Sequence, residues 1–105
     1  MAQSDAHLEV LPGKMVQLIN RVSEPVTVII YSGADVITEK MSSHQSQTIR
    51  LSGEASFIQV ALEREEGSNR ATKPPVLFPV KGGQRYVLVW NYEVKRVEPH
   101  YVKGG

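Results

Sequence analysis

The chain has 105 residues, 41% of them hydrophobic, and its 12 Lys and Arg against 11 Asp and Glu give a formal net charge of +1. This length predicts a single domain that can bury one core without a metal or a disulfide. The near-neutral charge and the absence of a basic run argue against nucleic acid or an anionic membrane as the main partner. No apolar run approaches the roughly 20 residues of a membrane span, and the absence of cysteine excludes disulfides and thiolate chemistry.

The first residues suggest a compartment only weakly. Residues 1–6 are polar, lack the apolar region of a signal peptide, and are expected to be a flexible N-terminus before a domain spanning 7–103. Ala2-Gln3-Ser4 is a plausible start for a processed secreted protein with Met1 added, and an ordinary cytoplasmic N-terminus fits equally well. We therefore expect a periplasmic or secreted protein, with a cytoplasmic location left open.

The first third of the chain predicts three strands. Leu8 and Val10 indicate a short edge strand before a Pro12-Gly13 turn, and a strand is expected over 15–20. The β-branched run at 25–31 is the strongest strand signal here, with Pro25 at its first position, where the missing N–H costs least. Because only residues 21–24 separate the second and third strands, they are expected to form an antiparallel hairpin.

The middle of the chain predicts shorter strands. A weak strand at 36–38 precedes a polar loop at 41–46, and alternating residues then indicate strands at 48–51 and 57–62. The segment 63–75 has six charges and ends at a Pro-Pro pair, which is typical of a mobile surface loop.

The stretch 76–93 holds the most large apolar surface, including the single tryptophan. Gly82-Gly83 is interpreted either as a corner between two sheets, locked by the hydroxyl of Tyr86, or as a simple hairpin turn. A last strand is expected over 97–102, on an edge or next to a bulge, because Pro99 lacks a ladder donor. Seven or eight short strands without a long helix predict an all-β fold, a single immunoglobulin-like antiparallel β-sandwich.

Residues with catalytic or metal-binding chemistry do not cluster in the sequence. Met41 and His44 are three residues apart in one loop and suit copper, but one such pair does not make a site. Asp35, Ser43 and His44 could be assembled into a hydrolase set, yet no Gly-x-Ser-x-Gly elbow is present. We expect no enzyme activity, no cofactor and no bound metal.

Aromatic residues give the better candidate site. Tyr86, Leu88, Trp90 and Tyr92 share one face of a strand by its period of two. Trp90, Tyr92, His100 and Tyr101 are the candidate binding residues, as a surface for sugar stacking or protein docking. In the alternative interpretation, Trp90 anchors the core.

The run from Val16 to Val28, a strand ending in Asn20 followed by Ser23, Pro25 and a second strand, resembles the opening of small periplasmic β-sandwich domains. Domains of this kind occur in the periplasmic adaptor of alginate O-acetylation and its relatives in the acetylation of other exopolysaccharides. The similarity extends over residues 12–90, including the Gly-to-Tyr strand from Gly83. The adaptor has two such domains where this chain has one, and no functional residue is carried over.

The resemblance implies a non-catalytic accessory role in a secretion or modification complex. We expect a non-enzymatic accessory domain that docks a protein or a polysaccharide in an envelope or exopolysaccharide complex. Its exposed edge strands could also support homo-oligomers by strand addition. Copper handling is the first alternative function and a small hydrolase the second.

Overall fold

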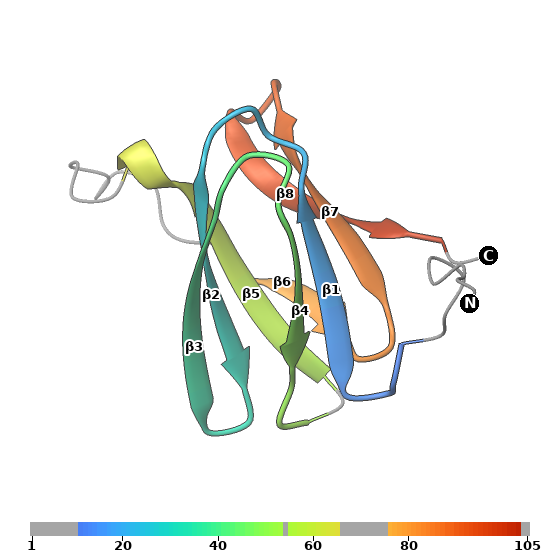
Figure 1. Cartoon of the computed structure of the whole chain (residues 1–105). Helices are drawn as coiled ribbons and strands as arrows, with labels where there is room; N and C mark the ends of the chain where they lie inside the picture. Colours follow the sequence, from blue (N-terminus) through green and yellow to red (C-terminus); the bar gives the residue numbers. More distant parts are fainter. Residues whose placement is uncertain (1–10, 54, 66–75, 104–105) are drawn as a thin grey trace.

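The computed structural model describes residues 11–53, 55–65 and 76–103. In this part of the chain, two four-stranded sheets face each other as a β-sandwich (Figure 1). Sheet A has the order β4-β1-β7-β8 and sheet B the order β3-β2-β5-β6. The strands are β1 (Met15–Asn20), β2 (Val26–Ser32), β3 (Asp35–Met41), β4 (Ser46–Arg50), β5 (Ala55–Leu62), β6 (Phe78–Lys81), β7 (Arg85–Asn91) and β8 (Arg96–Val102).

The core lies between the sheets and follows the period-two alternation of the strands. In β1, for example, Val16, Leu18 and Asn20 are buried and the residues between them are half-buried. Such alternation puts every second side chain of a strand on the same face. One 3-10 turn, η2 (Glu63–Glu65), follows β5, and no helix among the described residues is long and apolar enough to cross a membrane.

The structure corrects the expected pairing of the first strands. β1 and β2 do not form a hairpin, because β1 pairs with β4 and β7 in sheet A while β2 pairs with β3 and β5 in sheet B. The connection between them therefore crosses from one sheet to the other. The expected all-antiparallel arrangement is also wrong at one place, since β1 and β7 run parallel.

Two further expectations change in extent. The weak strand expected at 36–38 is a seven-residue strand, β3, and its last residue Met41 is fully buried instead of lying in a polar loop. The Leu8–Val10 strand, the flexible N-terminus and most of the 63–75 loop lie outside the described residues.

The corner interpretation of Gly82-Gly83 is confirmed, since the chain passes there from β6 in sheet B to β7 in sheet A. The Tyr86 hydroxyl accepts a hydrogen bond from the Lys81 N–H at 2.9 Å and donates one to Gln84 Oε1 at 2.7 Å. Gly83 has a φ of 84°, which favours glycine. A Cβ on Gly82 would lie 1.9 Å from the Gly13 carbonyl oxygen, so two backbone segments touch at this corner.

Contacts between the edge strands close both open sides of the sandwich. On one side, Gln47 Nε2 of β4 donates to Glu39 Oε1 of β3 at 2.6 Å. On the other side, the Arg96 guanidinium of β8 lies 5.6 Å from the ring centroid of Phe78 in β6. Pro99 lies in β8, an edge strand of sheet A, as its missing N–H predicts.

Candidate functional site

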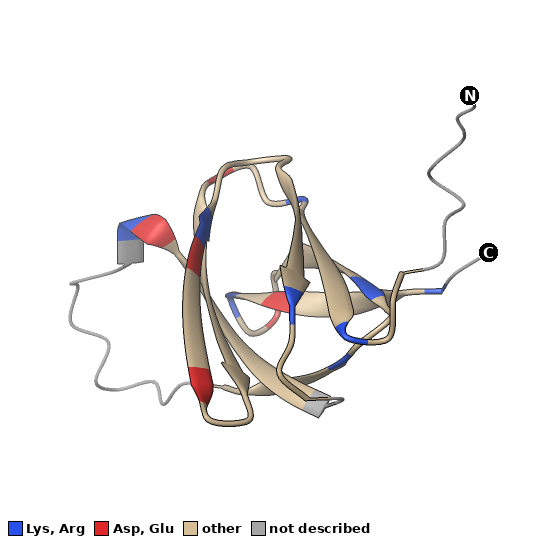
Figure 2. Ribbon diagram, turned by 60° about the horizontal axis from the view of Figure 1, so that its bottom comes forward, with Lys and Arg blue, Asp and Glu red and all other residues tan. Residues whose placement is uncertain are grey.

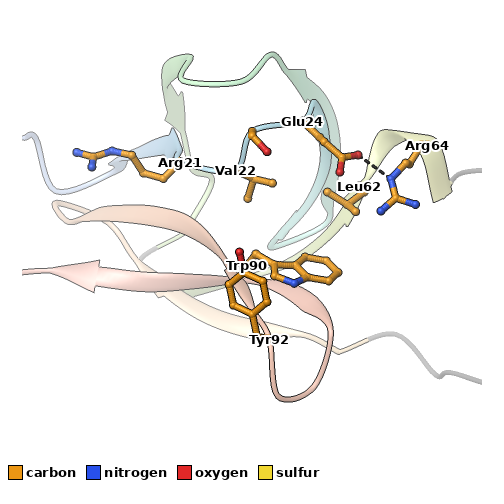
Figure 3. A pocket seen from close by; sticks show the side chains of 8 residues that line it. Arg21, Val22, Glu24, Leu62, Arg64, Trp90 and Tyr92 are labelled. Carbon is orange, nitrogen blue, oxygen red and sulfur yellow. Dashed lines mark hydrogen bonds and ion pairs between the residues drawn. The ribbon is translucent and has the colours of Figure 1, made fainter.

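A pocket of about 550 Å³ lies beside the end of β7, whereas the Gly82-Gly83 corner precedes the start of that strand. Figure 3 shows the side chains that line the pocket. It is formed where the β1–β2 crossover meets the end of β5, the 3-10 turn and the end of β7. Its lining combines apolar, aromatic and charged side chains: Arg21, Val22, Ser23, Glu24, Leu62, Arg64, Trp90 and Tyr92.

Asn20, the last residue of β1, builds the crossover that lines this pocket. Its buried side-chain amide donates to the carbonyls of Glu24 at 3.0 Å, Met41 at 3.4 Å and Ser42 at 3.0 Å. Its Oδ1 accepts the Val22 N–H at 2.9 Å. A buried amide that satisfies this many backbone groups is costly to remove, so Asn20 fixes the path of residues 21–24.

The aromatic pair Trp90 and Tyr92 forms one wall of the pocket. Trp90 is half-buried and packs against the core, while Tyr92 has 83% of its surface exposed. The two rings lie 6.5 Å apart at 83°, an edge-to-face arrangement that is favourable for aromatic pairs. Trp90 thus packs against the core and also lines the pocket.

The opposite wall carries the charges. Arg64 Nε lies 2.7 Å from Glu24 Oε1, and both side chains are more than one third exposed. Ion pairs at such exposure add little to stability because water screens them. Their contribution is therefore to place a guanidinium and a carboxylate opposite Trp90, whereas the Arg21 side chain points away from the indole (Figure 3).

The structure separates His100 and Tyr101 from the other two candidate binding residues. On β8, Tyr101 pairs with Tyr86, four residues before Trp90 along β7, which corresponds to about 13 Å. The Tyr101 ring lies 6.0 Å from that of Tyr86. His100 points to the outer face of sheet A, so the four residues do not form one cluster.

His100 belongs to a polar network centred on Glu98, on the outer face of sheet A. Glu98 accepts from Asn91 Nδ2 at 3.1 Å and from Arg96 Nε at 2.8 Å, and His100 Nε2 lies 3.7 Å away. The Asn91 hydrogen bond first, and then the Arg96 guanidinium, lower the pKa of Glu98 below its ordinary value, against an opposing effect of burial. This network tethers the two ends of the β7–β8 turn.

The residues named for the two alternative functions, all of which the structure describes, do not come together. Asp35 begins β3, whereas Ser43 and His44 follow its other end, about 20 Å away by strand length. Asp35 instead accepts a hydrogen bond from the Ser52 hydroxyl, and the Ser43 hydroxyl donates to the Val22 carbonyl at 2.8 Å.

Met41 is buried in the core while His44 is exposed in a turn, with a positive φ of 67°, so the two residues considered for the copper alternative do not converge. Among residues 11–53, 55–65 and 76–103, no three His, Asp or Glu side chains gather as a metal site.

The sequence did not predict that the β1–β2 crossover, residues 21–24, lines the pocket. Asn20 could have been found, because alternation places it on the same face as Val16 and Leu18, and a polar residue at a core position signals a structural role. The sequence contains no pattern that predicts the ion pair between Glu24 and Arg64, since forty residues separate them.

Comparison with known proteins gives no assignment. No protein-family model matches the chain, and no curated protein matches its sequence.

Proposed function

We propose that this protein is a non-enzymatic accessory domain, of immunoglobulin-like topology and periplasmic or secreted location, that binds a polysaccharide segment in the Trp90 pocket. The observation that carries the proposal is the composition of the pocket walls. A half-buried indole and an exposed phenol stand on one side, with a guanidinium and a carboxylate on the other. Sugars stack on aromatic faces while polar side chains bind their hydroxyls, and about 550 Å³ accommodates one or two sugar rings.

The resemblance of residues 12–90 to domains of exopolysaccharide acetylation adaptors agrees with this role. It supplies no residue, so the proposal rests on the pocket itself. An accessory domain of this kind would hold a polymer for partner proteins and would perform no chemistry on it.

A protein segment is the second candidate ligand. Val22 and Leu62 give the pocket an apolar floor, and Trp, Tyr and Arg are the residue types that dominate binding energy in protein interfaces. A peptide would insert one apolar side chain against this floor.

The single tryptophan provides the test. Titration with neutral and acidic polysaccharides should change Trp90 fluorescence, because the ligand replaces water at the indole. Tyr92→Ala should weaken the binding about tenfold by removing the exposed wall. Tyr101→Ala is the matched control, since Tyr101 is also an exposed tyrosine of sheet A but lies away from the pocket.

Unchanged fluorescence with every polysaccharide would exclude sugar stacking at Trp90. Equal losses in the Tyr92 and Tyr101 variants would place the ligand outside the pocket.

A further inference from the structure

Tyr92, the exposed wall of the Trp90 pocket, depends on its turn for its position. It is the first residue of the β7–β8 turn, residues 92–95, and 83% of its surface is exposed. Its ring packs edge-to-face against Trp90, with 6.5 Å between the ring centroids. An exposed side chain with few apolar contacts does not fix its own backbone. The turn therefore has to place the ring.

Asn91, the last residue of β7, builds that turn. Its Oδ1 accepts the Glu93 N–H at 2.9 Å and the Val94 N–H at 3.4 Å, and its carbonyl accepts the Lys95 N–H at 2.7 Å. A side chain that bonds the backbone two residues further on forms an Asx turn, which sets the path of the chain. The three N–H groups that follow Tyr92 thus converge on Asn91.

Glu98 holds the Asn91 side chain in the orientation that this turn requires. An asparagine amide has an acceptor end and a donor end, and only the oxygen can accept the two N–H groups of the turn. The Nδ2 end donates to Glu98 Oε1 at 3.1 Å, and Glu98 Oε2 accepts from Arg96 Nε at 2.8 Å. The carboxylate therefore selects the amide orientation and connects β7 to β8 where both strands meet the turn.

Glu98 lies in a basic part of the fold. Among the described strands of sheet A it is the only acidic residue, while Arg50, Arg85 and Arg96 are basic (Figure 2). The crossover adds Arg21, whose N–H bonds the Leu88 carbonyl on the other side of β7. The Glu98 side chain is only 13% exposed, so water screens its interactions less than those of an exposed pair.

The closer charges also favour the carboxylate form of Glu98. The other residues of β8 and of the turn that carry or acquire charge are Arg96, His100, Glu93 and Lys95. The β7 residues beside Glu98, Val89 and Asn91, are uncharged. His100 Nε2 lies 3.7 Å from Glu98 Oε1, so its protonation adds a positive charge that supports the carboxylate. Acid therefore weakens the hydrogen bond to Asn91 only when Glu98 itself takes up a proton.

We propose that Glu98 is a positioning residue for the Trp90 pocket: through Asn91, its carboxylate holds the β7–β8 turn in the form that presents Tyr92 beside the indole. This inference rests on the proposed function for its consequence, which is that a ligand of the pocket binds more weakly once Glu98 is neutral. The pocket thereby responds to acid through two residues, Glu98 and Asn91, that do not line it.

The Trp90–Tyr92 ring pair of the full chain gives the first test, without a ligand. Near-UV circular dichroism reports how the rings are packed, and acrylamide quenching reports the exposure of the indole. At neutral pH, Glu98→Gln should lose roughly half or more of the near-UV signal that Tyr92→Ala removes, because a charge-assisted hydrogen bond is about twice as strong as a neutral one. Quenching of Trp90 should rise in the same variant.

Glu39→Gln is the matched control. Glu39 also accepts a hydrogen bond from a side-chain amide, Gln47 Nε2, at 2.6 Å, but it lies in β3 of the other sheet. Its variant should keep the wild-type ring signals. Thermal unfolding shows that each variant is folded at the temperature of the measurement.

Asn91→Asp should respond to acid in the opposite direction to the wild type. It keeps an oxygen for the N–H groups of the turn but sets a second carboxylate against Glu98, so the ring signals should be weakened at neutral pH. Two neighbouring carboxylates share a proton on mild acidification. The ring signals of this variant should therefore recover as the pH falls, while those of the wild type weaken. A contribution of Glu98 to stability alone would not reverse the direction.

Ligand binding tests the consequence. Dextran is the neutral probe, because its own charge does not change with pH. Its dissociation constant should rise about tenfold in Glu98→Gln, as in Tyr92→Ala, and should be unchanged in Glu39→Gln. If neither dextran nor any other polysaccharide binds the wild type, the proposed function fails, while the ring signals still decide the role of Glu98.

Wild-type ring signals in Glu98→Gln at neutral pH would overturn the proposal. So would an Asn91→Asp variant whose ring signals do not recover in acid, because the carboxylate would then not act on Tyr92 through Asn91.

Discussion

The two ends of the sandwich connect the sheets in opposite ways. At one end, the Gly82-Gly83 corner presses backbone against the backbone of Gly13, and no room for a side chain is left. At the other end, a buried side chain, Asn20, ties the β1–β2 crossover to the end of β3, and a pocket lies between the crossover and the end of β7. A backbone contact closes one end of the fold, whereas at the other end the side-chain scaffold of Asn20 lies beside a pocket.

We expect an added methyl group to lower the stability of the protein more at the Gly82-Gly83 corner than at the pocket end. Gly82→Ala should lower the free energy of unfolding by about 3 kcal/mol, because the new Cβ collides with the Gly13 carbonyl and neither backbone can yield. Gly13→Ala is the matched control, since its Cβ would meet nothing within 4 Å, and it should change stability by less than about 1 kcal/mol. Chemical denaturation measures both. Equal effects would show that the corner is not closed by this contact.

The pocket end should respond to loss of its scaffold. Asn20→Ala should destabilise the protein by about 2–3 kcal/mol, because it leaves the Val22 N–H and several carbonyls without their partner. It should also shift the fluorescence of Trp90 in the folded state, since the facing crossover is released. Gln17→Ala, which removes the more exposed polar side chain that pairs across to Ser46 and Arg85, should cost roughly 0.5 kcal/mol and leave the fluorescence unchanged.

If the Asn20 variant unfolds at the wild-type denaturant concentration, the scaffold role is wrong. If the variant loses stability but the fluorescence of Trp90 is unchanged, Asn20 holds the loop after β3 and does not shape the pocket.

The smallest expected effect concerns the β7–β8 turn beside the pocket. The pKa of Glu98 is lowered in the folded state, so its carboxylate stabilises the fold fully above the pKa of the unfolded chain. That contribution is lost as the pH falls through the lower pKa of the folded state. Unfolding free energies of the wild type and Glu98→Gln, measured from neutral to acidic pH, should therefore converge on acidification. A gap that is constant or grows in acid would contradict the assignment.

Much of the fold follows from local pattern. The alternation of apolar residues predicted the strand Met15–Asn20, and it predicted residues 57–62 of the longer strand β5, with the inward residues of both. Pro99 indicated an edge strand. The candidate site was predicted only in part. Trp90 and Tyr92 do lie together, because two residues along one strand share a face.

What the sequence by itself determined is roughly where the described strands lie and, for most of them, which side is apolar, since both depend on the period of two along the chain. Only the tertiary structure decided which strands pair. That choice put β1 and β2 in different sheets, brought Glu24 to Arg64 and sent His100 to the far face from Trp90. The reason is physical, because pairing is selected by the packing of all eight described strands at once, and no local pattern encodes that sum.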